Sequence, residues 1–445
     1  MLRKCPVMEG TDTTVREGTC APPRKEGLSL CWVWPESRLE PLHGPRFSIG
    51  RDSSAKIRVL GNGVSRQHAE LYRQGRLWVV RDLASTNGTW LSGRRVEHAP
   101  VSAGDVLRVG DWVGVFVTWP ADAPAFSELA PGLLGGPEMA EIVSSVRRAA
   151  PSSLPVLLVG STGTGKERFA RAVHHFSNRT GPFIAINCAA LPEQLSEAEL
   201  FGYRRGAFTG AERGSIGHFR AAHQGTLFLD EMPELTAPLQ AKLLRVIEDG
   251  QVLGLGESHA TPVDVRIISA SQRPLGTLVA RGKLREDLAA RLTGVELLLP
   301  PLAQRRTDIA PLFAHVLRQH AGSRPPPVEA RLIEALCSYD WPRNVRELEL
   351  ATKALLAVRG HEPTLLRSHL PAAIAGHVEE EEPARRPLAR EPVERRAHDL
   401  AKIKALLETN GGNIKGAAAE LGISRQRVYR LMNGNMRGDK NDLGS

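Results

Sequence analysis

The sequence predicts a multidomain protein in which an all-β sandwich is followed by an α/β domain with a helical lid and then by a small all-α domain. Three observations support this order. Short apolar-alternating runs separated by turn residues occupy residues 28–119, which is typical of a β-sandwich. A glycine-rich turn after a buried-strand pattern begins at Gly160, and helical repeats joined by a glycine-containing turn return after His398.

The composition is typical of a soluble globular protein, with 42% hydrophobic and 24% charged residues among 445. The net charge of +9 suggests an anionic partner, although the basic residues are spread along the chain. No apolar run reaches the roughly 18 residues of a membrane span, and the first residues lack a signal-peptide pattern. The five cysteines are odd in number and lack C-x-x-C spacing, so we expect reduced thiols in a cytoplasmic protein. Because no apolar span is present, we expect no membrane partner.

Changes of composition and periodicity along the chain set the expected boundaries. Residues 120–135 are rich in Pro, Ala and Gly, and residues 375–396 pass from acidic to basic, so both stretches are expected to be linkers. The expected segments are a disordered tail at 1–27, the β-sandwich at 28–119, a linker at 120–135, the α/β subdomain at 136–303, its helical lid at 304–374, a linker at 375–396, the C-terminal helical domain at 397–436 and a tail at 437–445.

Three polar clusters lie in turns of the expected sandwich, at 50–51, 65–68 and 85–89. Together they offer guanidinium groups, hydroxyls and an amide, which suit the charge and geometry of a phosphate ester. The alternative is a sandwich that serves only as a scaffold, with solvated polar turns. The side chains concerned are those of Arg51, Ser65, Arg66, Thr86 and Asn87.

In order and spacing, these clusters resemble the forkhead-associated (FHA) domain, a β-sandwich that binds phosphothreonine. The resemblance implies that Arg51, Ser65, Arg66, Thr86 and Asn87 contact a phosphopeptide. It also implies that His68 braces its loop from within. The implied partner is a phosphothreonine-containing protein, such as a Ser/Thr kinase or its substrate.

The central domain contains a G-x-x-x-x-G-K motif between a short apolar strand pattern and a helical pattern. Backbone N–H groups of such a loop surround phosphate oxygens, and the motif lysine reaches the terminal phosphates. The alternative is a glycine-rich turn that binds nothing. Glu167 occupies the place where Ser or Thr usually holds Mg²⁺. The candidate nucleotide-binding residues of this stretch are Gly160, Ser161, Thr162, Gly163, Thr164, Gly165, Lys166 and Glu167.

Two later strand patterns end in polar residues, where open α/β sheets bind ligands. One ends at Asn187 and the other at Asp230 and Glu231. Asp230 is the expected Mg²⁺ ligand, and Glu231 is the expected base that orients a water molecule. Either residue alone could instead cap the following helix. Arg285 and Arg291 lie six residues apart on a helical pattern, and from spacing alone we favour solvated or ion-paired positions for them.

Residues from about 136 to 370 resemble the AAA+ domain of bacterial enhancer-binding proteins, which activate sigma-54 RNA polymerase. The most specific match is a glycine-bounded loop that would otherwise be an ordinary turn. The resemblance implies that its tip, Phe208 and Thr209, contacts sigma-54. The residues of this loop are Gly206, Ala207, Phe208, Thr209, Gly210 and Ala211.

The same resemblance implies ATP and Mg²⁺ as cofactors and a homo-oligomeric ring, which we expect to be hexameric. Asn187 would be a switch that holds Glu231, and Arg346 of the lid would contact the nucleotide. Arg285 and Arg291 would be fingers that reach the nucleotide of a neighbouring subunit.

Three positions depart from the family pattern, because Ser161, Gln272 and Arg343 replace the usual Glu, Asn and Gly. Gln272 belongs to the implied catalytic set as its γ-phosphate sensor. Its side chain is one carbon longer than the usual Asn, which predicts a lowered or differently regulated hydrolysis rate.

After a charged linker, a tight turn at Gly422 separates two helical patterns, and the second exposes basic residues suited to base edges and phosphates. This C-terminal region resembles the Fis-type helix-turn-helix of the same activators. A basic protein-binding hairpin is the alternative. The expected DNA-binding residues are Lys415, Ser424, Arg425, Gln426, Arg427 and Arg430.

These features together predict a sigma-54-dependent transcription activator. It would bind enhancer DNA, sense a phosphothreonine partner and hydrolyse ATP to remodel the closed complex of sigma-54 RNA polymerase. An alternative is an FHA-docked DNA-binding regulator, for example a repressor, with weak or absent ATPase activity. A third hypothesis, an AAA+ remodeller of another protein, is disfavoured by the intact loop at 206–211.

Overall fold

The computed structural model describes residues 27–209, 211–322 and 325–376. Contacts divide the chain into one unit at Met1–Glu379 and another at Glu380–Ser445, and every described element lies in the first. The predicted helix-turn-helix at 397–436 and its candidate residues therefore lie outside the described residues. No helix of the described part is long and apolar enough to cross a membrane.

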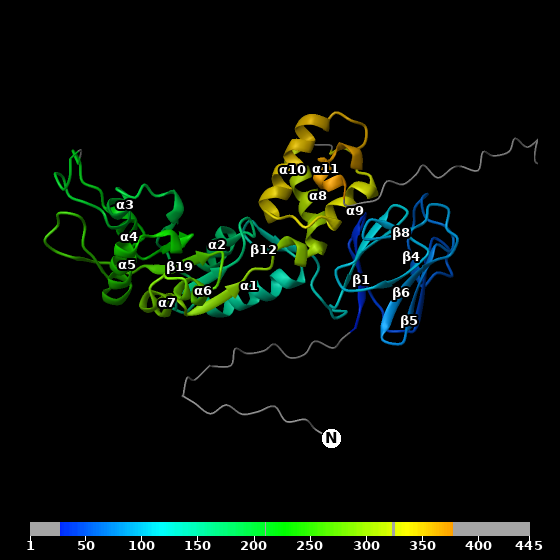
Figure 1. Cartoon of the computed structure of the whole chain (residues 1–445), viewed down its shortest axis with the longest axis horizontal. Helices are drawn as coiled ribbons and strands as arrows, with labels where there is room; N and C mark the ends of the chain where they lie inside the picture. Colours follow the sequence, from blue (N-terminus) through cyan, green and yellow to red (C-terminus); the bar gives the residue numbers. More distant parts are fainter. Residues whose placement is uncertain (1–26, 210, 323–324, 377–445) are drawn as a thin grey trace, which may run out of the picture. The chain divides into compact units, whose positions relative to one another are not determined.

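The N-terminal domain is a sandwich of two sheets, as predicted (Figure 1). One sheet has the order β2-β1-β11-β10-β7-β8 and consists of β2 (Arg38–Pro41), β1 (Ser29–Trp34), β11 (Trp112–Val117), β10 (Val106–Val109), β7 (Thr89–Leu91) and β8 (Arg94–Val96). The other has the order β4-β3-β5-β6-β9 and consists of β4 (Ile57–Arg58), β3 (Arg46–Gly50), β5 (Ala69–Gln74), β6 (Leu77–Asp82) and β9 (His98–Val101).

Side chains alternate between the two faces of β10, as the pleat of a strand requires. Leu107 and Val109 join the core between the two sheets. Val106 packs in a second core on the opposite face, and Arg108 is buried as well. All six residues of β11 are buried, so this part of the sheet is covered on both faces.

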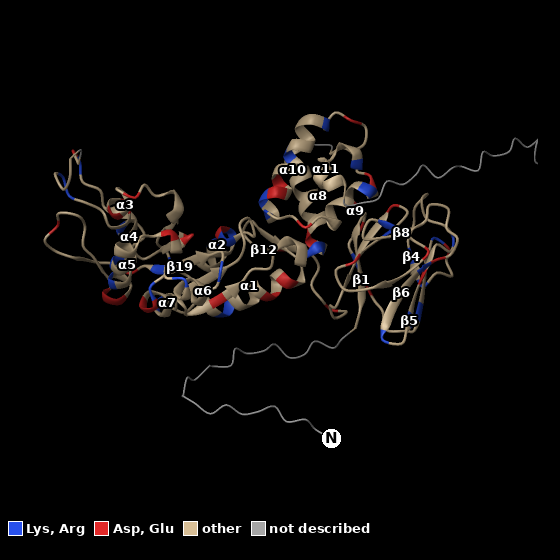
Figure 2. Cartoon of the chain, viewed as in Figure 1, with Lys and Arg blue, Asp and Glu red and all other residues tan. Residues whose placement is uncertain are grey.

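The range expected as a linker, 120–135, contains a hairpin of β12 (Ser127–Ala130) and β13 (Leu133–Gly135). Its Ala130 and Leu133 pack with Met139 of α1 (Pro137–Ala149) in the core of the next domain. Acidic residues begin α1 and basic residues end it, which complements the helix dipole (Figure 2). The Pro- and Gly-rich range 120–135 therefore includes an apolar hairpin that its composition did not predict.

The α/β subdomain is built on a parallel five-stranded sheet. Its order is β15 (Phe183–Asn187), β16 (Thr226–Asp230), β19 (Arg266–Ser271), β14 (Val156–Val159) and β20 (Val295–Leu298). Alternate residues of β14 enter two different cores, so both faces of the sheet are covered. The helices and the small hairpin are α2 (Lys166–Phe176), α3 (Ser196–Phe201), α4 (Gly217–Ala221), α5 (Ala237–Asp249), α6 (Leu275–Ala280), α7 (Glu286–Leu292), β17 (Gln251–Val252) and β18 (Thr261–Pro262), with 3₁₀ turns η1 (Cys188–Ala190) and η2 (Met232–Glu234).

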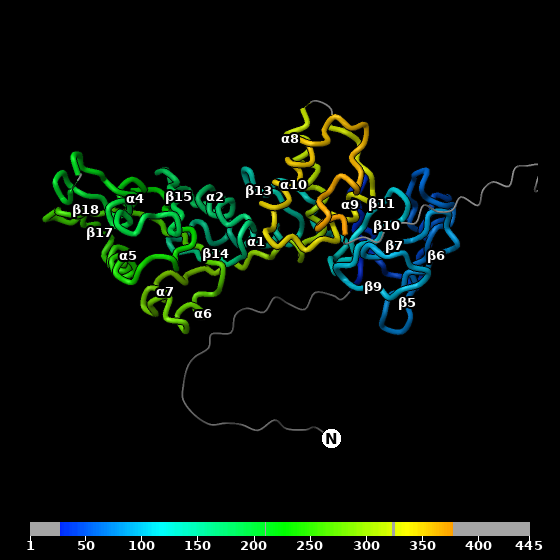
Figure 3. Tube along the Cα trace, turned by 45° about the horizontal axis from the view of Figure 1, so that its top comes forward, coloured from blue at the N-terminus to red at the C-terminus, as the bar shows by residue number. Residues whose placement is uncertain are grey.

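The lid is helical, as predicted (Figure 3). A buried ion pair at its start joins Arg305 Nη1 to Asp308 Oδ2 at 3.4 Å, and Arg305 Nη2 donates to Thr164 O at 3.1 Å. Its elements are η3 (Leu302–Gln304), η4 (Arg306–Asp308), α8 (Ile309–His320), α9 (Ala330–Ser338), α10 (Asn344–Arg359), η5 (Arg367–His369) and α11 (Ala372–Ala375).

The sandwich and the lid share one hydrophobic core, which we call the sandwich–lid interface. Its sandwich side is formed by alternate residues of β1, β10 and β11, and its lid side by α8, α9 and α11. Figures 1 and 3 both place α9 beside this sheet. Among the described cysteines, Cys31, Cys188 and Cys337 are buried free thiols, as expected for reduced cysteines.

Candidate functional site

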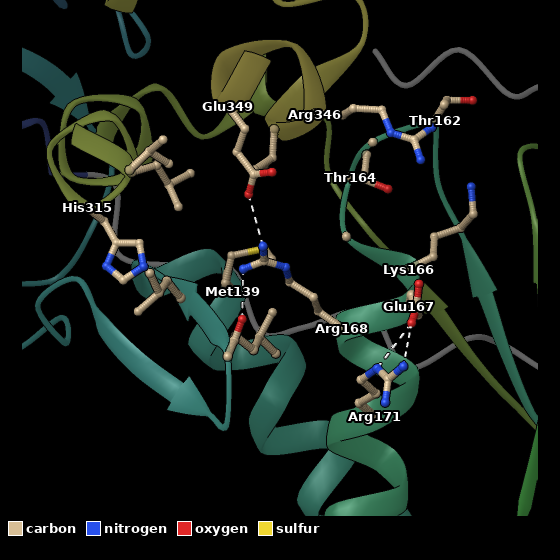
Figure 4. A pocket seen from close by; sticks show the side chains of 18 of the residues that line it. Met139, Thr162, Thr164, Lys166, Glu167, Arg168, Arg171, His315, Arg346 and Glu349 are labelled. Carbon is tan, nitrogen blue, oxygen red and sulfur yellow. Dashed lines mark hydrogen bonds and ion pairs between the residues drawn. The ribbon is translucent and has the colours of Figure 1, made fainter. Parts of the chain in front are cut away.

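The first candidate site is a cavity of about 900 Å³ between the glycine-rich loop, the β12–β13 hairpin and the lid. Figure 4 shows Thr162, Lys166 and Arg346 at one end and His315 of α8 at the other. Of the predicted nucleotide-binding residues, the cavity is lined by Thr162, Gly163, Thr164, Gly165, Lys166, Glu167 and Arg346. Gly160 and Ser161 lie at the base of the same loop and are not part of the lining.

The loop is held by its own short hydrogen bonds. Thr164 Oγ1 donates to Ser161 O at 2.8 Å, and the buried Lys166 donates from Nζ to Gly160 O at 3.0 Å. Gly165 has φ +103° immediately before α2, which favours glycine at this position. The loop therefore presents backbone N–H groups and the N-terminus of α2 to the cavity, an arrangement suited to phosphate.

The lid rests directly on this loop. Asn344 Nδ2 donates to Thr162 O at 2.9 Å, and Val345 N donates to Gly163 O at 3.0 Å. A Cβ at Gly163 would lie 2.1 Å from Arg343 O, so only glycine allows this approach. These contacts place the following residue, Arg346, in the cavity wall.

Asn187, Asp230 and Glu231 also line the cavity, at the carboxyl ends of β15 and β16. Burial raises the pKa of Asp230, and Lys166 opposes this shift. Glu231 adopts φ +52°, and its Oε1 lies 3.7 Å from Lys166 Nζ. Because Mg²⁺ takes one or two carboxylates together with phosphate oxygens, Asp230 suits such an ion.

The side-chain amides of Gln272 and Asn187, at the ends of two strands, have different hydrogen-bond partners. Gln272 Nε2 donates to Glu231 Oε1 at 3.0 Å. Asn187 instead accepts a hydrogen bond at Oδ1 from Ala189 N at 3.0 Å, so its carbonyl oxygen caps the turn that follows its strand. The side-chain amide that is hydrogen-bonded to Glu231 in this structure is therefore that of Gln272, whereas the sequence resemblance implied that of Asn187.

A second candidate site is a cavity of about 380 Å³ at the turns of the sandwich. Ser65 Oγ accepts a hydrogen bond from Thr86 N at 3.1 Å, and Asn87 Nδ2 donates to Gly63 O at 2.9 Å. These bonds tie two turns together. All five candidate phosphopeptide residues line the cavity, namely Arg51, Ser65, Arg66, Thr86 and Asn87.

His68 lies beneath this cavity and is fully buried. Its Nδ1 accepts a hydrogen bond from Ser65 N at 3.1 Å, so Nε2 carries the proton that is donated to Gly88 O at 3.0 Å. Burial lowers the pKa of His68, and the imidazole is neutral. The side chain therefore braces the loop from within, as predicted.

The loop at 206–211 is described except for Gly210. Gly206 N donates to Ala211 O at 2.9 Å and Ala211 N donates to Phe208 O at 3.0 Å, so the loop closes on itself. Phe208 packs 5.0 Å from Tyr203 between ring centroids yet remains 37% exposed, and Thr209 is exposed. The aromatic ring and the hydroxyl group are therefore available to a partner.

Comparison with known proteins assigns each domain. Family models match as a sigma-54 interaction domain at residues 134–298, an FHA domain at 47–110, an AAA+ ATPase lid domain at 303–387 and a bacterial regulatory protein, Fis family, at 394–433.

The transcriptional regulatory protein ZraR of Salmonella typhimurium is 39% identical over 314 residues, which cover 69% of this chain and 70% of ZraR. The chain belongs to the sigma-54-dependent transcriptional regulators. The transcriptional regulatory protein GlrR of Escherichia coli K12 is 43% identical over 300 residues, so this regulator spans 66% of the length of GlrR. The structure of NtrX from Brucella abortus in complex with ADP has a TM-score of 0.50 at 32% identity and covers 66% of this chain and 67% of NtrX.

Arg285 and Arg291 of this sigma-54-dependent regulator do not line the nucleotide cavity. Arg285 pairs with Asp287 at 2.6 Å, and Arg291 pairs with Glu248 at 3.0 Å. Both are exposed ion-paired residues, which is what their spacing alone favoured. Within one chain, both side chains form surface ion pairs at or next to α7.

Sequence reasoning missed the far wall of the nucleotide cavity. Leu312, His315 and Val316 of α8 line it, and so does Arg168, which donates to Glu349 Oε1 at 2.9 Å. The helical periodicity of α8 indicates one buried face, but it does not show that a second face meets the glycine-rich loop. That information lies only in the position of the lid.

Proposed function

We propose that this regulator hydrolyses ATP and uses the energy to remodel the closed complex of sigma-54 RNA polymerase. The observation that carries the proposal is the convergence of Lys166, Asp230 and Glu231 on one cavity, whose size and phosphate-binding loop suit a nucleotide. NtrX, a similar protein, has been solved with ADP. The exposed tip at Phe208 and Thr209 is the proposed contact with sigma-54.

The geometry of the cavity supports a role for each of the residues that line it. When bound, Mg²⁺·ATP supplies the transferable phosphoryl group. The loop N–H groups and Lys166 would neutralise the phosphates, and Asp230 would hold the metal ion. Glu231 would orient the attacking water, with Gln272 restraining one carboxylate oxygen. Arg346 would contact the nucleotide from the lid, and Asn187 would face it from β15.

The remaining partners complete the proposal. The FHA cavity would bind a phosphothreonine-containing protein through Arg51 and Arg66, and the Fis-type domain would bind enhancer DNA. Arg285, immediately before α7, and Arg291 on α7 are exposed, and we propose that they reach the cavity of a neighbouring subunit in a hexameric ring. On assembly, each arginine would leave its intrachain carboxylate and bind phosphate of the neighbouring subunit's nucleotide.

Steady-state ATPase activity and transcription from a sigma-54 promoter test the proposal together. Glu231→Gln should abolish turnover, whereas Glu234→Gln, an exposed carboxylate three residues later, should retain it. Thr209→Ala should retain ATPase activity and lose transcription, with the exposed Thr180→Ala as control. Turnover insensitive to Glu231→Gln, or transcription insensitive to Thr209→Ala, would contradict the proposal.

One observation favours a second candidate function, a DNA-binding regulator with weak ATPase activity. The amide of Gln272 occupies Glu231 Oε1, which competes with a water molecule for the same acceptor. Turnover of the wild type at the background level of Glu231→Gln would support this candidate. Turnover clearly above that background would eliminate it.

A further inference from the structure

Two side chains on the outer face of the sandwich are buried although they point away from its core. Trp90 on β7 pairs directly with Arg108 on β10, and the guanidinium carbon lies 4.6 Å from the ring centroid. Their neighbours Leu91 and Leu107 face the sandwich core instead. Trp90 is 2% exposed and Arg108 is 3% exposed, so another element must cover this face.

The covering element is α9 of the lid. Arg108 Nε donates to Glu334 Oε2 at 2.5 Å, and the Glu334 side chain is fully buried. Burial raises the pKa of Glu334, and the neighbouring guanidinium of Arg108 opposes the shift. Because a buried charge that loses its partner is strongly destabilising, this pair makes the docking of β10 on α9 specific.

Apolar contacts surround the pair. Val106, Val113 and Val115 of the sandwich belong to the same core as Ile333 and Leu336 of α9. All five side chains are buried, as in the interior of a single domain. The sandwich–lid interface is therefore a packed core that includes one ion pair, and it joins residues 226 positions apart in the chain.

The same tryptophan reaches the candidate phosphopeptide cavity. Trp90 Nε1 donates to Asn87 O at 3.2 Å, and the Asn87 side chain donates to Gly63 O. Asn87 and Gly63 both line the cavity. The backbone of this turn is thus anchored by the side chain on which Arg108 stacks.

On its other side, α9 connects to the nucleotide cavity. Arg306 Nη1 donates to Cys337 O at 2.6 Å, which ties the end of α9 to the start of α8. α8 packs on α9 and contributes Leu312 and His315 to the cavity wall. Direct contacts therefore connect α9 to the wall of the candidate nucleotide cavity.

We propose that the Trp90–Arg108–Glu334 contact couples phosphopeptide binding to docking of the FHA domain on the lid. Docking holds the Asn87 turn in the shape that binds phosphothreonine, and by linkage a bound phosphopeptide stabilises docking. The two states are the docked and undocked sandwich. The inference rests on the proposed phosphopeptide function. It adds that phosphopeptide binding acts on the lid through this contact.

The test compares phosphopeptide affinity in full-length variants. Arg108→Leu/Glu334→Leu replaces the ion pair by apolar side chains, which preserves packing better than removal of one charge. The matched control is Arg81→Leu/Glu70→Leu, an ion pair of 2.6 Å in the other sheet. Trp90→Phe keeps a ring under Arg108 but removes the donor to Asn87. The probe is the best-binding member of a phosphothreonine peptide library, measured by fluorescence anisotropy.

We expect about fivefold to tenfold weaker binding in the Arg108/Glu334 variant and in Trp90→Phe, and unchanged binding in the control, as for an ordinary coupling between sites. If the Arg108/Glu334 variant does not fold, Glu334→Gln, which keeps an acceptor beside Arg108 but removes the charge, takes its place. Unchanged affinity in the folded variants, with a wild type that binds phosphothreonine selectively, would overturn the coupling and leave the phosphopeptide function standing. A wild type that binds phosphothreonine and threonine peptides alike would overturn both.

Discussion

The contact between Gln272 and Glu231 yields a quantitative prediction for ATP hydrolysis. The donor and acceptor lie 3.0 Å apart. In Gln272→Asn the amide is withdrawn by one carbon–carbon bond, about 1.5 Å, which takes it out of hydrogen-bond range. Glu231 Oε1 then loses its amide donor and is more available to the attacking water, although Lys166 Nζ still lies 3.7 Å away. A single shortened side chain would therefore release the proposed base without altering the phosphate-binding loop.

The expected effect follows from the strength of this hydrogen bond. A bond between partly exposed groups contributes a net of about 1 kcal/mol, which corresponds to roughly fivefold in rate. We expect kcat of Gln272→Asn to rise about fivefold with KM unchanged in a steady-state ATPase assay. The exposed Gln194→Asn is the control for the substitution itself, and Glu231→Gln sets the background. An unchanged or lower kcat would refute the reasoning.

Three further predictions concern binding and stability. Arg66→Lys keeps the charge but loses bidentate geometry, so calorimetry should show roughly tenfold weaker phosphothreonine peptide binding; equal affinity would contradict a direct phosphate contact. Asp308→Ala leaves the buried Arg305 and the N–H of Gly136 without their acceptor and should cost about 3–5 kcal/mol in urea unfolding, whereas Asp308→Asn keeps an acceptor and should cost less. The pKa of His68 is lowered in the folded protein, so the unfolded chain binds the proton more readily. The contribution of the neutral His68 to stability is therefore complete above about pH 6.5 and declines as the pH falls towards the pKa of the folded state. Unfolding of His68→Gln should show a weaker loss of stability on acidification, and an identical pH profile would contradict this assignment.

Residues that act within one loop or at adjacent strand ends could be predicted from the sequence. Lys166 and the glycines around it share one loop, and Asp230 and Glu231 lie at the end of one strand, so the local sequence already indicates that they lie together. The five phosphopeptide candidates also converge on one cavity, because each lies in a turn at the same end of the sandwich.

Contacts between distant elements could not be predicted in the same way. The partner of Glu231 depends on which neighbouring strand end, at Asn187 or Gln272, turns its amide towards it. The hairpin at 127–135 was hidden by its Pro- and Gly-rich surroundings. One signal of the sandwich–lid interface was present, because Trp112–Val117 is apolar on both faces, a pattern consistent with a strand covered on both sides.

The doubly covered strand β11 limits how freely the sandwich domain can be exchanged between proteins. A fragment that ended at residue 119 would display Val113, Val115 and Val117 as one apolar stripe and would leave Arg108 without its acid. Such a stripe on a sheet favours self-association. Transplanting this sandwich to another AAA+ domain would require α9 to move with it. The sandwich and the lid would therefore have to be exchanged together, even though the α/β subdomain separates them in the sequence.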